Sequence, residues 1–179
     1  MIELRPVAAI DPYRYDSANH LLYGYLYQSK EYNPLLGNVK REFAELDARL
    51  IKLDAFKELV FAFSKACKVH HETEIGVHQI RTTCSANNYG NPAPEGIHRD
   101  GADFVAIFSV DRQNLEGGET HLYTARKQKP VFSKILHPGE LLLANDRELF
   151  HFTTPIKPTS DAMGTRDVFV LTSPSLLSE

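Results

Sequence analysis

The sequence predicts an α+β protein that is mainly β, with a jelly roll as its core and N-terminal helices packed on it. Three observations lead to this fold class. Residues 1–73 hold stretches with apolar residues at helical spacing, whereas residues 74–179 alternate short strand-like runs with Gly, Pro, Asn and Asp. The chain has no internal repeat, and no flexible linker divides the two parts. We therefore expect residues 1–179 to form a single domain, with 1–73 as helical support and 74–179 as the β-core that carries the site.

The first third of the chain contains three predicted helices. Tyr13–Gln28 is dense in apolar and aromatic residues, although its Tyr23–Tyr27 part would also suit a strand. A second helix is expected from Val39 to about Leu53, because apolar residues recur there in steps of three and four. The third has Asp54 as its predicted N-cap and ends near Lys68. Its predicted buried stripe consists of Phe56, Leu59, Val60 and Phe63.

The rest of the chain is predicted to form short strands bounded by turn residues. They are Val77–Thr83, Ile97–Asp100, Phe104–Val110, Thr120–Tyr123, Pro130–Ile135, Glu140–Ala144, Leu149–Thr153 and Asp167–Thr172. Strands of this number and spacing are typical of a sandwich or barrel of the jelly-roll kind. The loops Cys84–Gly96 and Thr154–Thr165 are long for a compact domain, and such loops are usually functional or disordered. Both flank the candidate site described next, so we expect them to act as lids.

The composition is that of an ordinary globular domain and argues against several classes of function. A net charge of −3 offers no basic surface, so we expect no nucleic-acid partner. No run approaches the roughly 18 apolar residues of a membrane span, so no membrane partner is expected either. Cys67 and Cys84 form neither a metal motif nor a disulfide framework. With no apolar leader at its start, the chain is expected to be cytoplasmic. The sequence does not predict an oligomeric state.

His98, Asp100 and His151 are the candidate metal ligands and catalytic residues. If His98 and Asp100 lie on a strand, their i, i+2 spacing points both side chains to the same side of the sheet. His151 lies in the apolar run Leu149–Phe152, where an imidazole needs a reason to be buried. Two imidazoles and one carboxylate bind one face of a metal and leave the other face open. This is the ligand set of non-haem Fe(II) oxygenases.

Arg166 is the candidate for binding an anionic cosubstrate. It begins the last predicted strand on the mostly apolar face that it shares with Val168 and Val170, where its guanidinium requires an anion. Asp167 is the alternative partner, but adjacent residues of a strand point to opposite faces.

Arg81 and Gln79 are candidate contacts for a polar substrate. They share one face of the predicted strand Val77–Thr83, and a polar face on a core strand could line a ligand cavity. The alternative is that this face lies at an exposed edge of the sheet.

Several stretches around these residues resemble one known family. Pro94–Gly101, followed by Asp103–Val105, resembles the metal-binding stretch of the bacterial 2-oxoglutarate/Fe(II) dioxygenases that hydroxylate free L-amino acids, of which the isoleucine dioxygenases are the best-known members. Asn114–Glu119, Ala144–Arg147 and His151–Ile156 are similar to later blocks of that family. The similarity spans roughly residues 77–172 and is specific, because separate blocks agree in order and spacing.

The resemblance implies a site, a fold and a reaction. His98, Asp100 and His151 would bind Fe(II), and Arg166 would pair with the distal carboxylate of the cosubstrate 2-oxoglutarate. The implied fold is a double-stranded β-helix, the cupin-like form of the jelly roll. The implied reaction uses O₂ to convert 2-oxoglutarate to succinate and CO₂ while an aliphatic C–H of a small molecule, a free L-amino acid, is hydroxylated. Because Asp100 occupies a ligand position, there is no room for a halide, and halogenation is disfavoured.

Three other functions stay open from the sequence. Two imidazoles, a carboxylate and a water also describe a catalytic zinc site, so a hydrolase with Glu95 or Asp103 as general base is one alternative. It gives Arg166 no role. The second alternative is a non-catalytic jelly-roll binding protein, although it would not require the three ligands and the arginine together. The third is an oxygenase that acts on a carrier-bound or peptide-bound residue, which an open site would favour.

Overall fold

The computed structural model describes residues 2–10, 25–26, 28–33, 35, 37–39, 46–70, 73–174 and 176–178. Its helices and strands are, in chain order, β1 (Ile2–Ile10), β2 (Tyr25–Leu26), α1 (Ala48–Lys52), α2 (Asp54–Cys67), β3 (Ile75–Cys84), β4 (Phe104–Gln113), β5 (Leu115–Gly117), β6 (Glu119–Tyr123), β7 (Phe132–Ile135), β8 (Leu141–Asn145), β9 (Phe150–Thr153), β10 (Ile156–Pro158), β11 (Gly164–Ser173) and β12 (Leu177–Ser178). None of the helices in these residues has the length and apolar run that crossing a bilayer requires.

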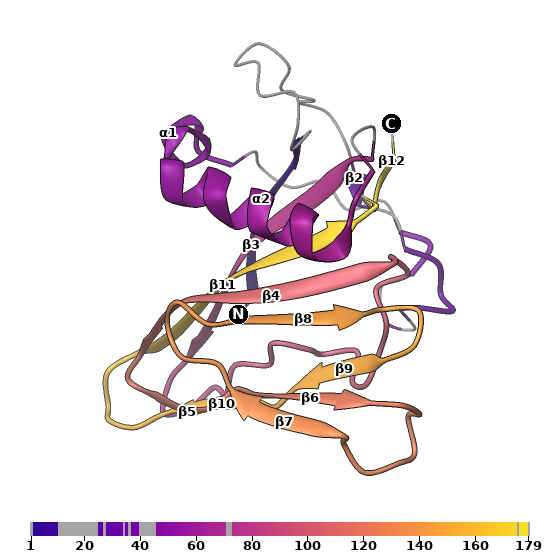
Figure 1. Ribbon diagram of the computed structural model, residues 1–179. Coiled ribbons are helices and arrows are strands. Elements are labelled where there is room, and N and C mark those ends of the chain that lie inside the picture. Colours follow the sequence, from indigo (N-terminus) through magenta and orange to yellow (C-terminus); the bar gives the residue numbers. More distant parts are fainter. Residues whose placement is uncertain are drawn as a thin grey trace.

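Two antiparallel sheets form the body of the molecule. The larger has the strand order β1-β3-β11-β4-β8 and the smaller the order β7-β6-β9, while β10-β5 and β12-β2 form short two-stranded pairs. The larger sheet lies between helix α2 and the smaller sheet (Figure 1). Strands that lie side by side in the larger sheet are far apart in the sequence, which is typical of jelly rolls. The predicted class, a mainly β jelly roll with few helices, is confirmed.

Helix α2 covers the outer face of the larger sheet. The buried residues of its apolar stripe are Phe56, Val60 and Phe63, and Leu59 is partly buried beside them. They pack against Phe169 and Leu171 of β11, and the rings of Phe56 and Phe169 meet edge to face with centroids 5.4 Å apart. The predicted stripe is therefore confirmed, and it fixes the outer face of β11 as apolar.

Truncating this core is expected to destabilise the protein strongly. Phe63 is fully buried, whereas Phe61 of the same helix is 51% exposed. Phe63→Ala should lower the free energy of unfolding by about 3–5 kcal/mol, because it removes buried apolar area and leaves a cavity. Phe61→Ala, the matched control, should change it by no more than about 0.5 kcal/mol. Urea unfolding of both variants measures the difference, and equal losses would contradict this packing.

The inner face of the larger sheet packs against the smaller sheet. Leu122 of β6 contacts Val105 of β4 and Ala144 of β8, and Val170 of β11 packs against the same cluster. Val168 lies in the adjoining cluster with Ile107. Because alternate residues of a strand share a face, Arg166 lies on the same inner face of β11 as Val168 and Val170.

The predicted helical support in residues 1–73 needs correction in three places. Ile2–Ile10 is a strand that pairs with β3 at the edge of the larger sheet. The second predicted helix begins only at Ala48, because the Asp47 carboxylate caps it by accepting a hydrogen bond from the Arg49 N–H. Of the first predicted helix, Tyr25–Leu26 forms strand β2 and most of the rest lies outside the described residues.

Two details of the third helix and of the long loops complete the comparison. The N-cap of α2 is Leu53 and not Asp54, which lies in the first turn. The predicted loop Thr154–Thr165 contains the short strand β10, and the loop Cys84–Gly96 is tied to it because Gly90 and Ile156 exchange backbone hydrogen bonds of 3.0 and 2.8 Å. A lid role for these loops stays a prediction.

Candidate metal centre

The three predicted ligands converge at one place. One ligand atom of each of His98, Asp100 and His151 lies within 4.8 Å of the others. His98 and Asp100 belong to the loop between β3 and β4, whereas His151 belongs to β9. The backbones of the two histidines exchange hydrogen bonds of 3.0 and 2.8 Å, which hold the loop beside the strand. The strand predicted at Ile97–Asp100 is therefore wrong. This stretch is a loop with a single bridge to β9.

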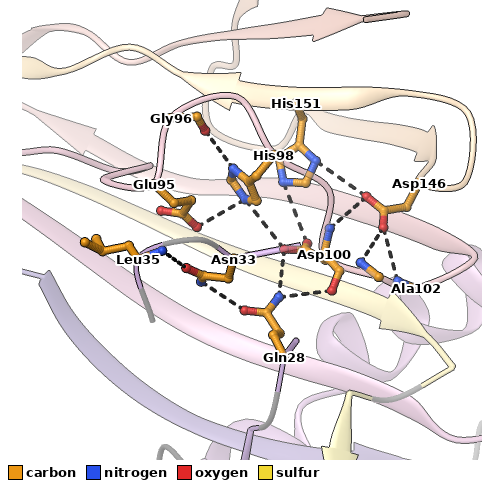
Figure 2. A network of polar contacts seen from close by, with 11 residues as sticks. Gln28, Asn33, Leu35, Glu95, Gly96, His98, Asp100, Ala102, Asp146 and His151 are labelled. Carbon is orange, nitrogen blue, oxygen red and sulfur yellow. Dashed lines mark hydrogen bonds and ion pairs between the residues drawn. The ribbon is translucent and has the colours of Figure 1, made fainter. Parts of the chain in front are cut away.

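The orientation of the His98 ring leaves one nitrogen for a metal. Its Nδ1 lies 2.8 Å from the carbonyl oxygen of Gly96, and since a carbonyl can only accept, Nδ1 carries the proton. The other nitrogen, Nε2, lies 3.2 Å from the Glu95 carboxylate and 3.6 Å from that of Asp100. Nε2 of His151 lies 3.7 Å from the other oxygen of Asp100 (Figure 2). Both Nε2 atoms therefore face the Asp100 carboxylate.

Two residues that were not predicted hold Asp100 in place. Gln28 donates from its side-chain amide to the Asp100 carbonyl at 3.1 Å and to its carboxylate at 3.3 Å. The buried Asp146 carboxylate accepts hydrogen bonds from the backbone N–H groups of Asp100, Gly101 and Ala102, at 3.1, 2.8 and 3.1 Å (Figure 2). These hydrogen bonds hold the loop that carries Asp100 in place.

The electrostatics of the site favour a cation. Burial raises the pKa of Asp100, but the charges of His151 and His98 and the hydrogen bond to His98 outweigh it, so the pKa lies well below its ordinary value. Burial lowers the pKa of His151 to about 4. Burial also lowers the pKa of His98, but the carboxylates of Asp100 and Glu95 outweigh this and raise it to about 9. The site thus holds buried anionic charge and one imidazole that stays neutral, which suits a divalent metal ion.

The distances fit a single ion bound by these three residues. Nitrogen and oxygen ligands bind such ions at about 2.0–2.2 Å, which places neighbouring ligand atoms roughly 3–3.5 Å apart. The separations of 3.6 and 3.7 Å between Asp100 and the two histidines need only small side-chain shifts to reach that spacing. His98, Asp100 and His151 could therefore hold one metal ion together.

The Arg166 side chain is buried in the interior, whereas the Arg81 side chain is exposed. Arg166 is only 4% exposed, on the inner face of β11. Arg81 lies on the opposite face of β3, where it forms a two-hydrogen-bond ion pair with Asp167 at 2.7 and 2.6 Å. Gln79 shares that outer face, since it pairs in register with Phe169 under helix α2. The structure thus gives no support to substrate contacts from Arg81 and Gln79. Asp167, considered above as a partner of Arg166, instead forms its ion pair with Arg81.

His78 of β3 influences the candidate centre electrostatically. It is 8% exposed, and its charge is one of the influences that lower the pKa of Asp100. Of the two general bases considered for a hydrolase, Glu95 lies at the site, whereas Asp103 forms a surface ion pair with Arg147. The sequence could not rank these residues, because their positions depend on contacts between distant parts of the chain.

Comparisons with known proteins agree with this arrangement. A family model described as 2OG-Fe dioxygenase matches residues 9–172. Among solved structures, the chain is similar to a bsmA homolog from Methylobium petroleophilum PM1, with a TM-score of 0.80 and 29% identity over 97% of this chain and 71% of the other. A search of curated proteins found no match.

Two further solved structures are similar in fold. IDO from Bacillus thuringiensis has a TM-score of 0.70 and 15% identity, over 97% of this chain and 76% of the other. The Fe(II)/(alpha)ketoglutarate-dependent dioxygenase TqaL has a TM-score of 0.60 and 20% identity, over 75% of this chain and 58% of the other. At such identities the likeness concerns the fold alone.

Proposed function

Because the chain belongs to the 2OG-Fe dioxygenase family, we propose that it hydroxylates an aliphatic C–H of a free L-amino acid or a related small molecule. The family uses Fe(II), 2-oxoglutarate and O₂. The observation that carries the proposal is the cluster of His98, Asp100 and His151, whose ligand atoms lie within 4.8 Å of one another. Family membership favours an oxygenase over the zinc hydrolase and over a non-catalytic binding protein.

Different residues of the chain would bind the metal, bind the cosubstrate and position the ligands in this reaction. His98, Asp100 and His151 would hold the iron, and Arg166 would hold the distal carboxylate of 2-oxoglutarate through its guanidinium. With iron and 2-oxoglutarate bound, O₂ would serve as the oxidant: one of its atoms would convert a substrate C–H to C–OH, and the other would enter succinate as CO₂ is released. Gln28 and Asp146 keep the Asp100 loop in position, and burial of the two histidines at 6% and 7% exposure limits the access of water.

The carboxylate of Glu95 supports an amino-acid substrate. It lies 3.2 Å from Nε2 of His98 and is 15% exposed, so it offers a negative charge beside the candidate metal position. A free amino acid carries an ammonium group, which such a carboxylate can bind by a charge-assisted hydrogen bond. A residue within a peptide has its α-nitrogen acylated and lacks this charge, whereas a residue esterified to a carrier through its carboxyl group keeps it.

Neutralising Glu95 is therefore expected to weaken the binding of a free amino acid. Glu95→Gln should raise the KM for the amino acid roughly tenfold or more, since a hydrogen bond to a charged group contributes about 1.5–3 kcal/mol. Decay of 2-oxoglutarate without substrate should persist. Glu58→Gln, at an exposed position of α2, is the control and should behave as wild type. An unchanged KM in Glu95→Gln would remove this support for an amino-acid substrate.

The proposed function is tested by anaerobic reconstitution with Fe(II) and 2-oxoglutarate. We expect the weak visible charge-transfer band of the iron–2-oxoglutarate complex. Addition of O₂ and a pool of free L-amino acids should then give succinate and a product heavier by one oxygen atom. A band without a product from the pool would leave the oxygenase and redirect the search to carrier-bound or peptide substrates. Absence of the band would contradict the oxygenase proposal.

A further inference from the structure

Two arginines lie side by side on the inner face of the larger sheet. Arg166 of β11 and Arg112 of β4 are directly opposite each other in the antiparallel register. Cross-strand partners point to the same face, so both side chains lie on the inner face of the larger sheet, which also carries Val168. A Cβ added to Gly118 would lie 2.9 Å from Nη1 of Arg112 and 3.4 Å from Cδ of Arg166. The two side chains therefore lie under the same glycine.

Neither arginine has an anionic partner among the described residues. Arg166, at 4% exposure, forms no hydrogen bond or ion pair within the described part of the chain. Burial, and after it the charge of Arg112, lowers the pKa of Arg166 to about 10, so the guanidinium remains charged. A buried cation is costly without a counter-charge, and a second cation beside it adds repulsion. Within the described residues the pair therefore lacks a counter-charge, which an anionic ligand can supply.

One end of Arg112 is fixed and the other is free. Its Nη2 donates to the carbonyl of Gly117 at 2.7 Å, whereas its Nη1 is buried with no hydrogen-bond partner. On the other side of Arg166, Thr82 of β3 occupies the paired position of the register. Thr82 is fully buried, and its hydroxyl also has no partner. Three neighbouring strands thus present unsatisfied donors in one row, in the order Thr82, Arg166, Arg112.

We propose that Arg112 and Thr82 join Arg166 in a single carboxylate site, so that two guanidiniums and one hydroxyl bind the distal carboxylate of the cosubstrate. This inference rests on the proposed function for the identity of the anion. Arg112 then acts as a specificity-determining residue, because it adds donors that only a 2-oxo acid with a second carboxylate can use. A 2-oxo acid that ends in a methyl group would leave both arginines unpaired and is selected against.

The test compares two ligands of equal chain length by calorimetry on the Fe(II)-loaded protein without O₂. 2-Oxoglutarate carries the distal carboxylate, and 2-oxopentanoate has a methyl group in its place. The dissociation constant of 2-oxopentanoate divided by that of 2-oxoglutarate measures how much the distal carboxylate contributes to binding. Arg112→Gln should reduce this ratio roughly tenfold or more, as expected for the loss of hydrogen bonds between charged groups. Binding of 2-oxopentanoate should be retained or become tighter, because this ligand loses no partner and one unpaired cation is removed, and its binding also shows that the variant is folded.

Two further variants sharpen the comparison. Thr82→Val keeps the shape of the side chain and should reduce the ratio only a few-fold, because a neutral hydroxyl is a weaker donor. Arg112→Lys keeps the charge but loses the fixed fork, so its ratio should fall between wild type and Arg112→Gln. Arg49→Gln, at a side chain that is 91% exposed on α1, is the control and should keep the wild-type ratio.

The outcomes separate this inference from the proposed function. If wild type binds no 2-oxoglutarate, the proposed function fails and the inference fails with it. If Arg166→Gln lowers the ratio while Arg112→Gln keeps it, the proposed function stands and Arg112 is not part of the site. Equal weakening of both ligands in Arg112→Gln would also overturn the inference, because Arg112 would then support the structure and not the distal carboxylate.

Discussion

His98→Ala is expected to abolish Fe(II) binding and turnover of 2-oxoglutarate while the protein remains folded. Among the described residues, the ring supplies one of the three candidate ligand atoms that lie within 4.8 Å of one another, and its Nδ1 already contacts the Gly96 carbonyl. Alanine offers no replacement nitrogen, and a remaining histidine and carboxylate bind a divalent ion far more weakly. Even changes to residues that only support metal ligands typically cost 10–100-fold in affinity, so we expect a larger loss here.

The fold should survive because the ring contributes little apolar packing. His98 lies among polar partners, namely Glu95, Asp100 and the ring of His151, whose centroid is 4.3 Å away. Its removal leaves Asp100 facing His151 and Gln28, so the buried carboxylate keeps partners. His121→Ala is the matched control, since His121 lies on β6 of the smaller sheet and pairs with Glu119. Wild-type iron stoichiometry in His98→Ala, measured with the control after anaerobic loading, would refute the assignment.

The candidate ligands could be predicted because their signals are local. His98 and Asp100 stand two residues apart in a turn-rich stretch, and His151 interrupts an apolar run. The expected strand at Ile97–Asp100 was nevertheless wrong. Gly101 has φ +92°, which is left-handed backbone, and the backbone N–H groups of Asp100, Gly101 and Ala102 donate to the Asp146 side chain and not to a neighbouring strand. His98 and Asp100 therefore point to the same site because Asp146 holds their loop, and not because they alternate along a strand.

Strand positions were predicted best where burial decides them. The apolar run Phe104–Val110 is the core of β4, but the strand continues to Gln113 because its polar end keeps pairing with β11. No period in the sequence marks such an extension. The supporting residues had no local signal either: Gln28 is 72 positions from Asp100, and Asp146 is 46 positions from it. Contacts of this kind depend on the topology of the two sheets.

Replacing Asp146 is expected to weaken both stability and metal binding, although this residue is not a predicted ligand. Its carboxylate accepts three backbone hydrogen bonds from the loop of Asp100 and is fully buried. One of its oxygens also lies 3.7 Å from Nδ1 of His151, a buried nitrogen without a hydrogen-bond partner. Asp146 therefore connects the loop that carries two candidate ligands with the ring of the third.

Asp146→Asn keeps the shape of the side chain but turns one of its acceptors into a donor that faces backbone N–H groups. We expect a loss of about 2–4 kcal/mol in the free energy of unfolding, since buried donors are left without partners. We also expect Fe(II) affinity to fall roughly 10–100-fold, as found for residues that orient metal ligands. Asp103→Asn, in a surface ion pair with Arg147, should change neither quantity strongly.

Phe63→Ala distinguishes positioning from general destabilisation. That variant should lose comparable stability in the core under α2, away from the ligands, and should bind Fe(II) as wild type well below its unfolding temperature. Asp146→Asn should bind Fe(II) more weakly under the same conditions, because its loop no longer holds Asp100 against the two imidazoles. Equal Fe(II) affinity in the two variants would reduce Asp146 to a stabilising residue. A specific loss in Asp146→Asn would show that the geometry of the centre depends on a carboxylate that need not touch the metal.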